Sequence, residues 1–119
     1  MATIVATDGK VKTADHWPEG TAAGYDVSFQ DEDGEAYTPE STIAAKVLSS
    51  DGTEIEDIGA IAAASTIEVT TEAATNNIGS YGIERIITLT WTAITTRYAA
   101  PGVTQRCEIH YYITDMVGV

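Results

Sequence analysis

The acidic segment Asp31-Glu32-Asp33-Gly34-Glu35 is the first place in this sequence where side chains could bind a metal ion. Ca²⁺ takes several hard oxygen ligands, and the alternating Asp31 and Asp33 could supply two carboxylates. The usual calcium-loop pattern also needs glycine at its sixth position and glutamate at its twelfth, whereas here Gly34 is fourth and Thr42 is twelfth. An Asp-Gly pair is itself typical of a tight turn. We therefore expect a solvated hairpin turn and no cofactor, with Asp31 and Asp33 as the candidate ligands should a cation bind.

Nucleophilic catalysis would have to use the single cysteine, Cys107, or one of the two histidines, His16 and His110. Successive side chains of a strand point to opposite faces, so an offset of three separates Cys107 from His110. A lone cysteine also excludes an intrachain disulfide and a cysteine-rich metal site. The remaining carboxylates concentrate in expected turns, whereas a general acid requires a desolvated pocket. We expect no catalytic residue, a protein that is not an enzyme, and Cys107 in the core.

Aromatic residues give the remaining chemical signal. Trp91 falls on the apolar face of an alternating segment and is expected to anchor the core. Four others fall at the ends of expected strands or in loops, namely Trp17, Tyr37, Tyr81 and Tyr98. Exposed aromatic rings can anchor a protein interface or a sugar, and they can equally cover the ends of a folded domain. Both alternatives stay open, and these four are the candidate interaction residues.

Strand-type alternation of apolar and polar residues runs through most of the chain and must position these side chains. It marks strands over residues 25–30, 42–49, 53–56, 65–71, 83–92 and 103–113. Three Asp-Gly pairs supply turns, at residues 8–9, 33–34 and 51–52. The Ala-rich segment 58–64 is the one helix candidate, and we expect a short helical or irregular crossover there.

The segments 83–92 and 103–113 are expected to form a long antiparallel pair. The residues predicted to face inward are Ile87, Leu89, Trp91, Val103, Cys107, Ile109, Tyr111 and Ile113. Those predicted to face outward include Thr88, Arg106, Glu108 and His110, and Glu84 or Arg85 could pair with Arg106 or Glu108 across the strands. Short strands separated by turns predict an all-β fold, a small antiparallel β-sandwich of about seven strands with little helix. Residues 23–119 would form the sandwich, and residues 1–22 an N-terminal arm or first strand.

Length and charge restrict the function further. The chain has 119 residues, the size of one domain, and a formal net charge of −12. Residues 1–57 carry 13 acids and 3 Lys, whereas residues 58–119 carry 5 acids and 3 Arg. A nucleic acid would be repelled by so acidic a chain. No apolar stretch approaches the length of a membrane-spanning helix, and the N-terminus shows no basic region followed by an apolar core. We expect neither nucleic-acid nor membrane partners and no secretory signal.

The segment 25–34 resembles the first strand and turn of bacterial and phage Ig-like modules, in which an alternating strand is followed by Asp-x-Asp-Gly and then Thr-Pro, here Thr38-Pro39. Ser50-Asp51-Gly52-Thr53 and the segment 82–92 with its partner strand are similar to later turns and the closing hairpin of such modules. The resemblance covers residues 23–117. The Cys…Trp…Cys framework of antibody domains is missing, so immunoglobulins proper are excluded.

A lone module of this length is more similar to a virion protein of a tailed phage or prophage than to a surface adhesin. The resemblance therefore implies a non-enzymatic structural or accessory protein, assembled in the bacterial cytoplasm into a virion, with other phage proteins or copies of itself as partners. The alternative is a carbohydrate- or cell-surface-binding β-sandwich module at the bacterial surface, with a possible calcium ion at Asp31 and Asp33.

Overall fold

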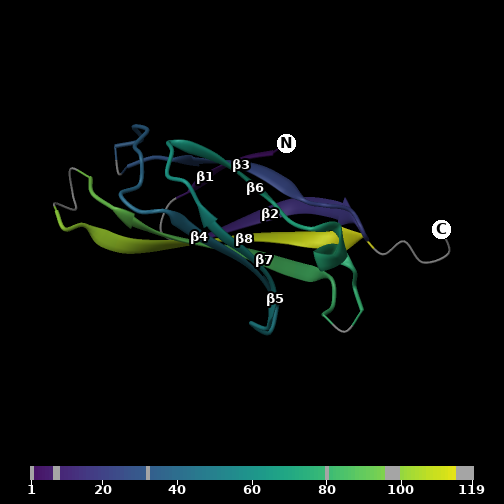
Figure 1. Ribbon diagram of the computed structural model, residues 1–119. Coiled ribbons are helices and arrows are strands. Elements are labelled where there is room, and N and C mark those ends of the chain that lie inside the picture. The colour runs from purple at the N-terminus through teal and green to yellow at the C-terminus, as the bar shows by residue number, and fades with distance from the viewer. Residues whose placement is uncertain (1, 7–8, 32, 80, 96–99, 115–119) are drawn as a thin grey trace.

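The computed structural model describes residues 2–6, 9–31, 33–79, 81–95 and 100–114 and shows an all-β fold (Figure 1). Its strands are β1 (Ala2–Ala6), β2 (Gly9–Pro18), β3 (Gly24–Phe29), β4 (Ile43–Ser49), β5 (Glu54–Ile61), β6 (Thr66–Thr70), β7 (Glu84–Ala93) and β8 (Val103–Thr114). The single helical element in these ranges is the 3₁₀ turn η1 (Ala73–Asn76). Within the same ranges no helix is long and apolar enough to cross a membrane.

The strands form two sheets, one of three strands in the order β1-β3-β6 and one of five in the order β2-β8-β7-β4-β5. Both sheets are mixed. β1 runs parallel to β3 and β2 runs parallel to β8, whereas the other pairs are antiparallel. The prediction of an all-β fold is confirmed, and that of a purely antiparallel one is not. Residues 2–6 and 9–18 add one edge strand to each sheet, and this N-terminal addition makes both sheets mixed.

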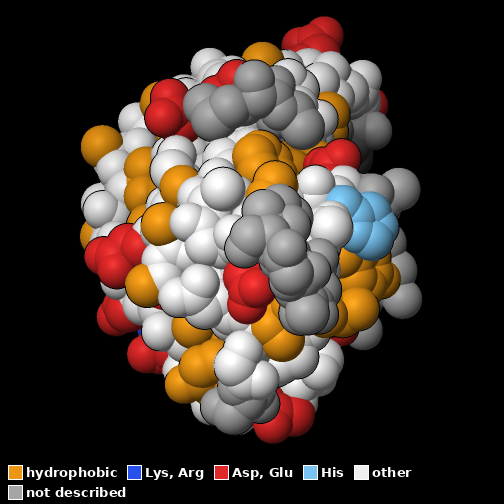
Figure 2. Space-filling view, turned by 90° about the vertical axis from the view of Figure 1, so that its right-hand side faces the viewer, with side chains coloured by type: hydrophobic (Ala, Val, Ile, Leu, Met, Phe, Trp, Pro, Cys, Tyr) orange, Lys and Arg blue, Asp and Glu red, His pale blue; other side chains and the backbone are white. Residues whose placement is uncertain are grey.

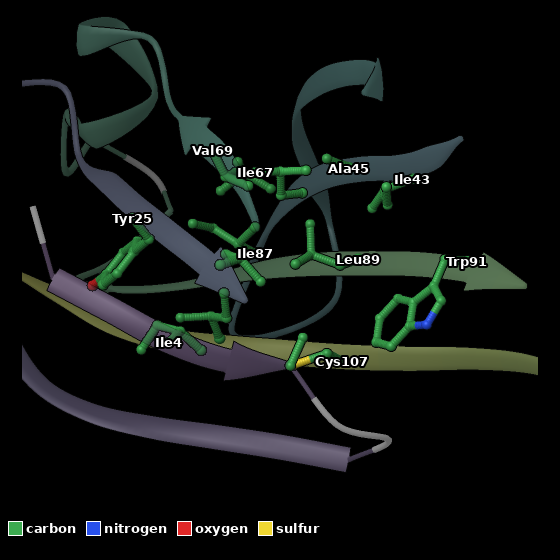
Figure 3. Packing of buried hydrophobic residues seen from close by; sticks show 14 of the residues in the cluster. Ile4, Tyr25, Ile43, Ala45, Ile67, Val69, Ile87, Leu89, Trp91 and Cys107 are labelled. Atoms are coloured by element: carbon green, nitrogen blue, oxygen red, sulfur yellow. The ribbon is translucent and has the colours of Figure 1, made fainter. Parts of the chain in front are cut away.

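One hydrophobic core lies between the two sheets (Figure 3). Tyr25, Ile67 and Val69 enter it from the three-stranded sheet, and Leu89 and Trp91 from the five-stranded sheet. Trp91 packs edge-on against the ring of Phe29, with the ring centroids 5.0 Å apart. The predicted alternation holds on β3, β4, β6, β7 and β8, where inward residues are buried and most neighbours face outward. Trp91 is a core anchor as expected, and Cys107 is a buried free thiol.

The Ala-rich segment 58–64 differs from the expectation of a helical or irregular crossover. Its first part, up to Ile61, completes β5 at the edge of the five-stranded sheet. The β4–β5 register shifts between Ala45 and Lys46, and Gly59 has a φ of +95°, a left-handed conformation that glycine adopts without strain. A helix of two turns would gain little by itself, and pairing with β4 satisfies the backbone instead.

The β4–β5 turn shows how the acidic side chains of the first half are used. Asp51 accepts hydrogen bonds through Oδ1 from the Ser49 hydroxyl and from the backbone N–H of Thr53, which is 2.9 Å away. These bonds favour the ionised carboxylate, so they lower the pKa of Asp51 from 3.8 to about 2. The predicted Asp-Gly turn at residues 51–52 therefore exists, and the aspartate closes it.

This arrangement predicts an acid-dependent contribution to stability. The pKa of Asp51 is lower in the folded chain than in the unfolded chain, so ionised Asp51 stabilises the fold above about pH 4. That contribution is lost as the pH falls toward 2. We expect the Tm difference between wild type and Asp51→Ala to be larger at pH 7 than at pH 2. Asp33→Ala, at an exposed residue of another turn, is the control. An equal Tm difference for Asp51→Ala at both pH values would contradict the assignment.

Candidate functional site

The acidic turn considered for calcium is closed by hydrogen bonds within the chain. Asp31 Oδ1 accepts from the backbone N–H groups of Asp33, at 2.9 Å, and Glu35, at 3.0 Å. The N–H of Gly34 donates to the carbonyl of Asp31, and Gly34 has a φ of +81°. Asp33 is exposed to solvent. Asp31 thus has a structural task in this turn, and calcium binding at Asp31 and Asp33 stays a prediction.

The four aromatic candidates are not brought together. The Nε1–H of Trp17 donates to the hydroxyl of Tyr25 over 3.1 Å, and Trp17 is half-buried against the core at one end of the molecule. Tyr37, also half-buried, lies at the other end, where its hydroxyl accepts from Trp91 Nε1 at 2.9 Å. Tyr81 is 40% exposed. Tyr98 lies outside the described residues.

The most unusual group in the molecule is the guanidinium of Arg85, which is fully buried at the start of β7. Its four hydrogen bonds to described residues all go to backbone carbonyls, and none goes to a carboxylate. Nε donates to Thr75 O at 2.9 Å and Nη2 to Asn77 O at 2.7 Å. Nη1 donates to Gly82 O at 2.7 Å and to Glu84 O at 3.0 Å. Burial lowers the pKa of Arg85. A single cation therefore fixes the connection between β6 and β7.

A second set of polar groups joins this connection to the core. Asn76 is fully buried and accepts a hydrogen bond from the hydroxyl of Tyr111, 2.7 Å from its Oδ1. Its amide nitrogen donates to Thr21 O and to the hydroxyl of Thr71. Burial raises the pKa of Tyr111, so its hydroxyl stays a donor. We call the residues Thr71, Asn76, Arg85 and Tyr111 the polar plug, because they fill one end of the space between the sheets.

Carboxylates hold the outer side of the same connection. Glu56 on β5 accepts from the backbone N–H of Glu72 at 2.9 Å and from the hydroxyl of Thr75 at 2.6 Å. Glu19, just after β2, accepts from the N–H of Ile78 at 2.9 Å. The connection is therefore tied to both edges of the five-stranded sheet. Several acids of the first half thus have structural tasks in addition to being solvated.

Arg85 does not form the pair with Glu108 across the outer face that the sequence left open as one possibility. Arg85 shares the inner face with Ile87, and the residue opposite it on β8 is Tyr111. The ion pair of Glu108 is formed along its own strand with Arg106, 3.5 Å away and exposed. Period-two alternation already places Arg85 inward, but a charged residue is so rarely buried that the pattern alone does not predict it.

His110 also departs from expectation. It lies on the outer face of β8, as predicted, yet it is buried rather than exposed. Its Nε2 is 3.2 Å from Glu108 Oε1, and its Nδ1 is 4.0 Å from Glu84 Oε1. Among the described side chains, Nδ1 is the one buried nitrogen or oxygen without a hydrogen-bond partner. The ring lies between two carboxylates because β7 and β8 place Glu84, His110 and Glu108 side by side.

These groups stabilise the fold through the contacts described above. No group of three or more His, Cys, Asp or Glu side chains in the described residues could hold a metal ion. The end of the molecule at which β8 ends carries hydrophobic side chains interspersed with Asp and Glu, and no blue Lys or Arg side chain is visible there (Figure 2). Two exposed apolar residues, Tyr81 and Ile83, precede β7.

Comparison with protein-family models, with curated proteins and with solved structures found no match to this chain.

The polar plug generates a stability prediction. We expect Arg85→Met to lower the free energy of unfolding by about 3–5 kcal/mol, because it leaves buried carbonyl groups without their donor. Arg85→Lys should still lose more than about 2 kcal/mol, since one ammonium group cannot reach four carbonyls spread around a planar guanidinium. Equilibrium unfolding in urea measures both variants.

Lys46→Met is the matched control. Lys46 forms a 3.1 Å ion pair with Glu54, but both side chains are about half exposed. An exposed ion pair contributes about 0–1 kcal/mol, so this variant should remain close to wild type. A loss at Arg85 no larger than the loss at Lys46 would refute the structural role of the buried guanidinium.

Proposed function

We propose that the chain is an Ig-like module that acts as a structural or accessory protein of a phage or prophage particle, through protein–protein contacts. The strand order supports the first part. In Ig domains, strands B and E share one sheet, and strands C, F and G share the other. With β3 as strand B, β6 corresponds to E, and β4, β7 and β8 correspond to C, F and G. The parallel N-terminal strands and the position of Trp91 on β7 are departures from that pattern.

One observation carries the functional part of the proposal. The residues whose types suggested chemistry are engaged in internal contacts: Asp31 closes a turn, Cys107 lies in the core, and His110 lies between two carboxylates. The free features of the described surface are strand edges and the exposed apolar residues Val5, Tyr81 and Ile83. Strand edges and exposed apolar side chains are the features that proteins use for association. The function therefore rests on surface contact.

The carbohydrate-binding alternative gains less support from the geometry. A sugar is commonly bound on aromatic rings that are accessible to the ligand. Of the three described candidates, Trp17 and Tyr37 donate or accept hydrogen bonds within the core, and only Tyr81 is exposed. Tyr81 also lies over the Arg85 guanidinium, 5.9 Å from ring centroid to Cζ. We therefore favour a protein partner.

The proposal predicts that the chain is a component of assembled phage particles. When lysogenic cells carrying its coding sequence are induced and particles are purified on a density gradient, quantitative mass spectrometry should find the chain enriched with capsid and tail proteins. A cytoplasmic enzyme of the same cells, measured in the same fractions, is the control for contamination. If particles form and the chain stays at the level of that enzyme, the assignment to a virion is wrong.

A further inference from the structure

The two sheets have four edge strands, and three of them carry features that oppose pairing with another chain. β2 contains Pro18 and a register break between Lys12 and His16. β5 carries carboxylates, among them Glu54 and Asp57, and its ladder is interrupted by bulges. β6 carries an exposed Glu68 at its centre. Charges, proline and bulges are the usual means by which proteins protect strand edges.

β1 has none of these protections. Its residues Ala2–Ala6 include no charged residue, proline or glycine, and among the described strands it pairs only with β3. Ile4 and Ala6 are buried and hold the strand on the core, whereas Thr3 and Val5 point outward. Val5 is 42% exposed, although it is apolar. The strand therefore presents a regular, uncharged edge with an exposed apolar side chain.

From this edge we infer that β1 is the site of self-association, pairing with β1 of a second copy about a two-fold axis. A two-fold axis perpendicular to the sheet makes the two strands antiparallel and joins two three-stranded sheets into one of six strands. Each strand then satisfies the outward N–H and C=O groups of the other, and β-branched Thr and Val side chains suit such a pair. This inference deepens the proposed contact function, on which it rests, by naming the contact strand and the partner.

Charge restricts where two copies of this chain can approach each other. Two chains that each carry a net charge of −12 repel one another, so they associate best where carboxylates are fewest. Among the described residues, the carboxylate nearest in register is Asp26 on β3, opposite Thr3 and one strand inward from the edge. It lies about 10 Å from the partner's β1, a distance over which exposed charges are strongly screened at physiological salt. Added salt should therefore strengthen the dimer, the reverse of its effect on contacts held by opposite charges.

The test is sedimentation equilibrium of the purified full chain between about 10 µM and about 1 mM, because a ladder of five residues makes a small, weak interface. We expect a monomer–dimer equilibrium for wild type that shifts toward dimer in 0.5 M NaCl. Val5→Lys places an ammonium group at the edge, as natural edge strands do, and should raise the dissociation constant at least about tenfold. Ile83→Lys is the control, because it also replaces an exposed apolar residue by lysine, at a residue that is 52% exposed just before β7. It should leave the dissociation constant of the dimer unchanged.

A monomeric wild-type chain throughout this range overturns the inference, as does a dimer that survives Val5→Lys or dissociates with Ile83→Lys. If Val5→Lys fails to fold, hydrogen exchange of wild type decides: amides of residues 2–6 should gain protection with concentration, and unchanged exchange overturns the inference. The particle experiment is independent of this one. Dimerisation through β1 without enrichment in particles refutes the virion role alone, and enrichment without dimerisation refutes this contact alone.

Discussion

The buried guanidinium of Arg85 is the interaction on which one end of the molecule depends. A long connection joins β6 to β7 across the space between the sheets, and its carbonyl groups would be buried without donors there. Arg85 supplies N–H groups in a rigid plane and binds three of these carbonyls together with that of Glu84, the first residue of β7. No carboxylate of the described residues accepts a hydrogen bond from this guanidinium, and the carbonyl dipoles compensate its charge instead. The carbonyl groups of the connection and the guanidinium of Arg85 hydrogen-bond each other. Burying either without the other would leave polar groups without partners.

The polar plug and the aromatic core divide the interior between them. At one end, Tyr111 donates to Asn76, whose amide donates to Thr71, and Arg85 beside them donates to the carbonyls of the residues on either side of Asn76. At the other, Phe29 and Trp91 pack edge to face, and the indole N–H donates to Tyr37. Apolar packing without polar contacts tolerates shifts in register, whereas directional hydrogen bonds require one alignment of the strands. The plug thus gives the two sheets a defined relation at the end where long connections cross.

The acidity of the first half has a related physical basis. Asp31 and Asp51 accept hydrogen bonds from backbone N–H groups in their turns, and Glu19 and Glu56 do so for the β6–β7 connection. At each of these places the chain is outside the regular strand pairing, and a carboxylate accepts the hydrogen bond that a backbone carbonyl would accept within a sheet. The remaining acids include residues of the β5 and β6 edges. The charge is therefore distributed so that it closes turns and protects edges, and β1 is the edge strand that lacks it.

The sequence by itself determined which residues form most strands and which side chains face the core, because a period of two is a local property of extended backbone. Val27, Leu89 and Ile109 are inward for that reason, and the Asp-Gly turn at residues 51–52 follows from the preferences of the same two residues. Only the tertiary structure decided that residues 2–6 and 9–18 join different sheets in parallel, since neither strand pairs with its neighbour in sequence. It also decided that Arg85 and His110 are buried. The carbonyls that bind Arg85 lie at most 10 residues from it, but its burial also depends on residues distant along the chain, such as Tyr111 opposite it on β8, and no local pattern encodes that packing.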